Sequence, residues 1–438
     1  MHLTALCETL DHEAAGEWVY QRIRAWYPLP RSITGDGLRA TLHGIGEHIP
    51  LEIHEVPTGT AVFDWTVPRE WNIRDAYVKD SAGRRVIDFG AHNLHVLGYS
   101  VPVHKTMPLA ELKEHCYTLP DQPDRIPYRN SYYNENWGFC LAQRRLDALE
   151  DGDYEVCIDA TLEDGALSYG ECCLPGQTEE EILVSAHACH PSLTNDNLSG
   201  LAVATYLARA LAQTEHRYTY RFVFAPGTIG AITWLARNET RLDRIAHGLI
   251  LACLGDSGAV TYKQSRCGDA AIDRAAAYAL GLSDDPFEVL PFTPYGYDER
   301  QYCSPGINLP VGCFMRTPPG QYPEYHTSGD NLDLVKPEFL SDSLAKLLAI
   351  LEVLERDGVY RNLNPKCEPQ LGKRGLYSAV GGRTDTRTIE MALLWVLNFS
   401  DADHSLLDVA ERSGIPLPQI RTAADALIEA GLLEDCAQ

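Results

Sequence analysis

The sequence lacks the features of a membrane or secreted protein. No apolar run in its 438 residues is long enough to cross a bilayer. The first twenty residues carry four acidic side chains and show no basic region followed by an apolar one, so they do not resemble a secretory signal. We therefore expect a cytoplasmic protein that does not enter a membrane.

Basic residues are also scarce. The chain has 37 Lys and Arg against 61 Asp and Glu, which gives a formal net charge of −24 at pH 7. Such a charge repels nucleic acid and anionic membranes on average. The 13 cysteines are odd in number and follow no framework spacing, so we interpret them as reduced thiols. A small-molecule or peptide substrate with a cationic group suits this charge better.

The length favours two or three domains. Residues 58–122 contain short apolar stretches separated by Pro and Gly, which predicts an inserted β-rich domain. In residues 1–57 and 123–365, apolar stretches typical of buried strands, such as 181–186, 220–225 and 247–253, alternate with helical patterns such as 198–211. This alternation predicts a three-layer α/β/α domain with a largely parallel, mixed sheet.

Residues 366–438 form a third region with the pattern of a winged helix. Helical segments are expected at 388–397, 405–413 and 418–430, followed by a short wing at 431–434. From residue 383 onward the chain has four Arg and no Lys against ten acidic residues. Phosphate contacts need Lys and Arg, so we interpret this region as a packing or homo-oligomerisation module. A ligand-sensing transcriptional regulator is a third hypothesis for the whole chain.

Two histidine clusters follow the ends of expected strands. His187, His190 and Asp196 lie within ten residues after one strand, and His326 follows a strand expected at about 308–314. Ligands bind outside the carboxyl ends of strands in open α/β sheets, and imidazoles and carboxylates are zinc ligands. The alternative interpretation of the first cluster is an Asx helix cap with two loop histidines.

These segments resemble the di-zinc aminopeptidase superfamily. Asp196-Asn197-Leu198-Ser199-Gly200 is similar to its Asp-Asn-x-Ser-Gly motif, whose Asp bridges two zinc ions. The segment that begins at Tyr325-His326 is similar to its Tyr-His-Thr-x-x-Asp segment. The whole chain resembles a bacterial aminopeptidase-like family with an N-terminal β insert and a C-terminal winged helix. The resemblance implies zinc ligation by His187, Asp196 and His326.

The chain departs from the superfamily pattern at two positions. Cys189 replaces the Asp of the His-x-Asp motif, and Gly227 stands where a carboxylate, the general base, is expected. A zinc-activated water needs a nearby base, and we name Glu299 for that role. With His187, Asp196 and His326 as ligands we expect one Zn²⁺. A second ion would need further ligands, for which we name two residues: His190, which could also replace His187, and Asp256.

The resulting hypothesis is a zinc-dependent hydrolase that cleaves an amide or peptide bond. Arg266, Arg316 and Tyr325 are the candidate substrate-binding residues, although the two arginines also fit a role in surface solubility. The absence of a carboxylate at Gly227 supports a different hypothesis: a repurposed aminopeptidase-like protein that binds a ligand without hydrolysing it.

Overall fold

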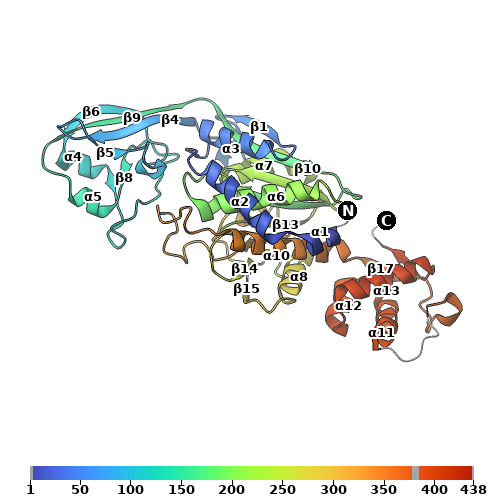
Figure 1. The fold of residues 1–438 in the computed structure, drawn as a ribbon. Coiled ribbons are helices and arrows are strands. Elements are labelled where there is room, and N and C mark those ends of the chain that lie inside the picture. The colour runs from blue at the N-terminus through green and yellow to red at the C-terminus, as the bar shows by residue number, and fades with distance from the viewer. Residues whose placement is uncertain (1–2, 377–383, 437–438) are drawn as a thin grey trace. The chain divides into compact units, whose positions relative to one another are not determined.

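The structure is a computed structural model that describes residues 3–376 and 384–436, with side chains for all of these except 384–387. The chain divides into two compact units, Met1–Leu348 and Ala349–Gln438, whose secondary structure is labelled in Figure 1. Among the described helices, none combines the length and the apolar character that crossing a membrane requires.

An eight-stranded mixed sheet forms the centre of the first unit. Four of its seven strand pairings are parallel, and they include the three between the central strands. The prediction of a mixed α/β fold is confirmed. The sheet order is β1 (Glu52–Pro57), β10 (Ala166–Leu174), β12 (Thr219–Ala225), β11 (Glu181–His187), β13 (Ile245–Leu251), β16 (Val311–Met315), β14 (Val260–Lys263) and β15 (Phe287–Leu290).

The central strands are apolar because both of their faces are covered. All seven residues of β11 and all seven of β12 are buried. Helix α6 (Gly200–Leu211) packs against β11, and α2 (His12–Trp26) packs against α6. Helix α8 (Ala271–Leu280) packs against β13 and β16, while α3 (Asp36–Gly46) and α7 (Ile229–Asn238) contact β10. This buried sheet holds the ends of β11 and β16 in fixed positions.

The insert is a four-stranded antiparallel sheet of order β5-β4-β9-β6. Its strands are β4 (Glu70–Lys79), β5 (Arg85–Asp88), β6 (Val103–Pro108) and β9 (Asp153–Glu163), with the short helices α4 (Leu109–Glu114) and α5 (Gln143–Asp147). The sheet therefore extends well beyond residue 122, where we expected the insert to end. Strand β9 pairs with both β4 and β6, and these long-range pairings leave no local signal at the boundary.

The second unit is a winged helix. Helices α11 (Thr384–Phe399), α12 (Leu406–Ser413) and α13 (Leu417–Glu429) accompany a three-stranded sheet of order β18-β17-β19. Helix α12 begins at a capping box formed by Ser405 and Asp408 and ends at Gly414, whose φ of 70° suits glycine. Strand β17 (Val359–Asn362) lies before residue 366, so the module starts earlier than expected. Strand β17 pairs with β18 (Asp401–Ser405) and with β19 (Leu433–Asp435).

Candidate metal centre

The candidate centre is built where β11 ends. His187 is the last residue of β11, and the chain then turns through His190 into an irregular π-helical segment, Thr194–Ser199, that leads into α6. The loop after β16 brings His326 to the same place. Residues from two loops, more than a hundred positions apart, therefore meet beyond the carboxyl ends of β11 and β16, two parallel strands that lie on either side of β13.

Asp196 lies at the middle of this cluster and is fully buried. His187 Nε2 is 2.8 Å from its Oδ1, while His190 Nδ1 and His326 Nε2 are 3.3 and 3.0 Å from its Oδ2. Ligand atoms of His187, His190 and Asp196 all lie within 4.8 Å of one another. Three imidazole nitrogens therefore lie within 3.3 Å of the oxygens of one carboxylate.

The donor atoms have the character of metal ligands. His190 Nδ1 and His326 Nε2 are buried, and neither has a well-aligned hydrogen-bond partner among the described residues. Burying a polar atom without a hydrogen-bond or metal partner costs free energy of folding. Burial, opposed by Asp196, lowers the pKa of His187 to about 4, so this imidazole is neutral at neutral pH. Burial alone would raise the pKa of Asp196, but the neighbouring histidines hold that pKa well below its usual value. The residues present fit a zinc ion.

Aromatic rings fix the orientation of the histidines. The Tyr297 ring stacks on His187 at 4.1 Å between centroids, and its hydroxyl donates to Asp196 Oδ2. Tyr325 stacks on His326 at 4.0 Å, and its hydroxyl lies 3.0 Å from that of Tyr297. Contacts of this kind around metal ligands hold ring orientation and tune affinity.

Asp330 holds the backbone of the Asp196 segment. Its carboxylate accepts hydrogen bonds from the backbone N–H groups of Thr194, Asn195 and Asp196 at 2.6 to 2.9 Å. Burial raises the pKa of Asp330 to about 6, although these N–H groups oppose the rise. Asp330 is the Asp of the Tyr-His-Thr-x-x-Asp segment, so one loop supplies both a candidate ligand and a clamp on the other loop.

Arg31 is a second clamp, which the sequence reasoning missed. Its Nε donates to the backbone oxygen of His190 at 2.9 Å, and its Nη1 donates to the backbone oxygen of Trp26. Burial lowers the pKa of this guanidinium to about 10. The only sequence signal is an arginine that follows a Pro-rich break and precedes Ser32, and 159 positions separate it from His190.

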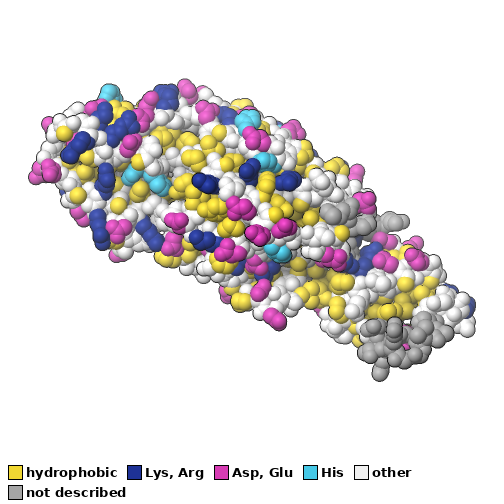
Figure 2. Space-filling view, viewed as in Figure 1, with side chains coloured by type: hydrophobic (Ala, Val, Ile, Leu, Met, Phe, Trp, Pro, Cys, Tyr) yellow, Lys and Arg dark blue, Asp and Glu magenta, His cyan; other side chains and the backbone are white. Residues whose placement is uncertain are grey.

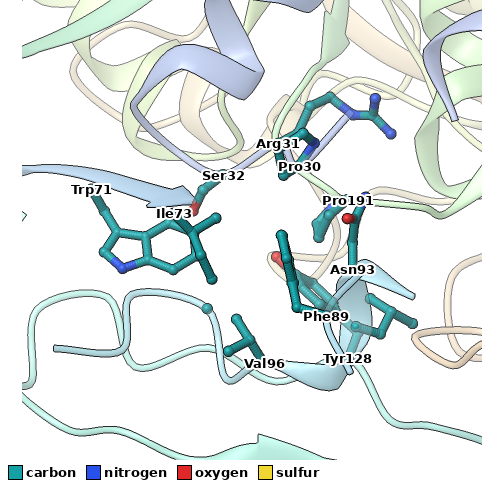
Figure 3. A pocket seen from close by; sticks show the side chains of 12 residues that line it. Pro30, Arg31, Ser32, Trp71, Ile73, Phe89, Asn93, Val96, Tyr128 and Pro191 are labelled. Atoms are coloured by element: carbon teal, nitrogen blue, oxygen red, sulfur yellow. The ribbon is translucent and has the colours of Figure 1, made fainter. Parts of the chain in front are cut away.

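A small cavity lies beside this clamp, between the insert and the α/β body. Figure 3 shows apolar side chains from both parts around it, including Trp71 and Phe89 from the insert and Pro191 from the metal-centre loop. The Arg31 guanidinium points away from these rings, toward its backbone partners. Tyr128 lines the same cavity and meets His190 and His326 edge-on, with centroids 5.0 and 5.1 Å away. The insert therefore borders the loop that carries His190 and Pro191.

The charged groups of four other predicted site residues are engaged by neighbouring side chains or backbone groups. Glu299 is buried and pairs with Lys263 at 2.8 Å. Asp256 accepts hydrogen bonds from Asn195, Gly258 and Thr317. Two predicted arginines complete this group: Arg316 pairs with Asp342 at 2.6 Å, and exposed Arg266 donates to Asn308 at 2.8 Å. The structure brings His187, His190, Asp196, His326 and Tyr325 together.

Comparison with known proteins agrees with this description. The fold defines an aminopeptidase-like α/β protein that carries a winged helix. The chain belongs to the family described as domain of unknown function DUF4910, which matches residues 20–357, and a winged helix-turn-helix family matches residues 358–435. The resemblance to an aminopeptidase-like family is confirmed.

Three relatives illustrate the range of similarity. A Clostridium acetobutylicum protein, named provisionally for polysaccharide biosynthesis and for an aminopeptidase-like domain, is 54% identical over 96% of this chain and 97% of its own. A crystal structure from the same organism, named as a candidate peptidase, has a TM-score of 0.91 at 50% identity and covers 99% of this chain and 100% of that one. A zinc aminopeptidase of Bacillus subtilis shares the fold, with a TM-score of 0.56 at 14% identity over 77% of this chain and 94% of that one.

Proposed function

We propose that this protein is a zinc-dependent hydrolase that cleaves an amide or peptide bond of a small substrate. The observation that carries the proposal is the convergence of His187, His190 and His326 on the buried carboxylate of Asp196. These four residues would hold the ion. When bound, zinc polarises a substrate carbonyl and lowers the pKa of a water molecule.

The protein's own residues prepare the centre for that chemistry. Asp330 and Arg31 hold the two ends of the loop between β11 and α6, so the ligands need little rearrangement. Tyr325 is the remaining candidate for substrate binding, because its hydroxyl lies beside that of Tyr297 at the centre. The net charge of −24 favours a substrate with a cationic group.

Metal content tests the proposal directly. Purified protein should carry zinc by elemental mass spectrometry, and His326→Ala and Asp196→Ala should lose it. His104→Ala is the matched control, because that histidine lies on the insert with 72% of its side chain exposed. A panel of aminoacyl 4-nitroanilides should be hydrolysed by the zinc-loaded protein and not after chelation. Full activity in His326→Ala would contradict the proposal.

One observation favours a second candidate function, that of a ligand-binding protein that kept the fold. Gly227 provides no carboxylate after β12. Zinc binding without hydrolysis of any member of the panel would support this candidate. Hydrolysis that depends on His326 would exclude it.

A further inference from the structure

Gly227 packs closely against the candidate metal centre. It lies between the end of β12 and the start of α7. A Cβ atom at this position would lie 3.1 Å from Cβ of His187 and 3.5 Å from Oδ1 of Asp298. Gly227 is therefore adjacent both to the candidate ligand His187 and to the carboxylate of Asp298, which comes from a different loop.

Among the described residues, Asp298 has no hydrogen-bond partner that accounts for its burial. Its side chain is almost completely buried, and neither carboxylate oxygen has a hydrogen-bond partner among the described residues. It stands at the N-cap of α9 (Glu299–Tyr302), yet its carboxylate caps no backbone N–H group. A buried carboxylate without partners is costly, and such groups concentrate at functional sites.

The adjacent carboxylate has a different environment. Lys263 lies 2.8 Å from Glu299 Oε1 and also donates to the backbone oxygen of Tyr295, so Glu299 neutralises a buried ammonium group. Burial and the charge of Glu299 raise the pKa of Asp298 to about 8, while Arg300 and His190 oppose the rise. Of these two adjacent carboxylates, Asp298 is the one that faces Gly227.

We propose that Asp298 is the general base of this centre and takes the place of the carboxylate that Gly227 lacks. This inference rests on the hydrolase function proposed above. A water oxygen forms a bond to the carbonyl carbon, and one water proton passes to the Asp298 carboxylate. The C–N bond then breaks, its electron pair stays on nitrogen, and the proton passes from Asp298 to that nitrogen. Asp298 begins and ends this cycle ionised, the form that predominates above its pKa of about 8.

The first test is Asp298→Asn in the zinc-loaded, full-length protein. With the 4-nitroanilide that wild type cleaves fastest, we expect kcat to fall by about 10²- to 10⁴-fold, the usual contribution of a general base. KM and zinc content should stay near wild type. Asp333→Asn is the matched control, because the side chain of Asp333 is exposed. Wild-type kcat in Asp298→Asn would overturn the inference.

Two rescues separate a proton-transfer role from a packing role. Formate should restore part of the activity of Asp298→Ala, because it supplies a carboxylate in the vacated space. In the Asp298→Asn background, Gly227→Glu should raise kcat, because its Cβ would lie 3.5 Å from the position of the lost carboxylate oxygen. His187 must then move by a few tenths of an ångström, since the new Cβ lies 3.1 Å from it. Loss of activity in Asp298→Ala without any recovery in formate would overturn the inference.

The outcomes distinguish this inference from the function on which it rests. A zinc-loaded wild-type protein that cleaves no member of the panel overturns both. Hydrolysis that depends on His326 but persists in Asp298→Asn leaves the hydrolase standing and removes Asp298 as its base.

Discussion

The raised pKa of Asp298 has a consequence for stability that needs no substrate. Its ordinary pKa is 3.8 and its pKa in the folded protein is about 8. Between these values the folded chain keeps a proton that the unfolded chain has lost. The stabilisation linked to this proton is therefore fully present below about pH 4 and is lost as pH rises toward 8.

Asp298→Asn removes this titration with almost no change of shape. One linked proton changes the free energy of unfolding by about 1.4 kcal/mol for each pH unit. The unfolding free energy of the variant minus that of wild type should therefore grow by on the order of 2–3 kcal/mol from pH 5 to pH 7. The increase should level off above pH 8, where both states of wild type are ionised.

Urea unfolding of the chelator-treated protein measures this difference. Wild type, Asp298→Asn and the exposed control Asp333→Asn would be unfolded at pH 5, 6, 7 and 8 and followed by tryptophan fluorescence. Other titrating groups are common to all three proteins, so they cancel in the difference. A difference between Asp298→Asn and wild type that is constant over this range would refute the reasoning, because it would mean that the Asp298 carboxyl ionises normally.

Three further predictions concern the supports of the centre and the second unit. Arg31→Met leaves the backbone oxygens of Trp26 and His190 without their donors and should cost about 1–3 kcal/mol, with weaker zinc binding in a chelator competition; unchanged stability would contradict the clamp. Tyr297→Phe keeps the ring on His187 but removes the donor to Asp196, so zinc affinity should fall by about tenfold; an equal affinity would show that the hydroxyl contributes nothing. The full chain should shift no DNA fragment at low salt, because its winged helix is acidic; a salt-sensitive shift would contradict this.

The surface drawn in Figure 2 is consistent with the last prediction. Acidic side chains are interspersed with basic ones across the described part of this face. Phosphate binding needs Lys and Arg gathered along one surface, whereas the region from residue 383 onward has ten acidic residues and four arginines.

Much of the fold could be predicted from local patterns. Continuous apolar stretches identified β11, β12 and β13 within two residues at each end, because strands buried on both faces carry no polar alternation. The turn residues around Gly414 likewise marked the break between α12 and α13. The end of the insert could not be found in this way. Strand β9 belongs to the insert only because it pairs with β4, and pairing partners are not written in a local pattern.

The sequence likewise identified some residues of the candidate site and not others. His187, Asp196 and His326 were identifiable as candidate ligands because they follow expected strand ends and lie in segments that resemble motifs of the di-zinc aminopeptidase superfamily. The clamp by Arg31 was not identifiable, because it acts on the backbone of a residue 159 positions away. The choice between two adjacent carboxylates was not identifiable either. The turn into α9 sends Glu299 to Lys263 and leaves Asp298 facing Gly227.

The sequence by itself determined the mixed α/β fold, the winged helix, the acidic charge and the candidate metal ligands. All of these follow from composition, periodicity and short motifs, which are properties of neighbouring residues. Only the tertiary structure decided which carboxylates are neutralised by a buried cation and which remain without a partner. Desolvation and hydrogen bonding depend on what distant parts of the chain bring to a side chain, and that is settled when the sheet, the insert and the loops pack together.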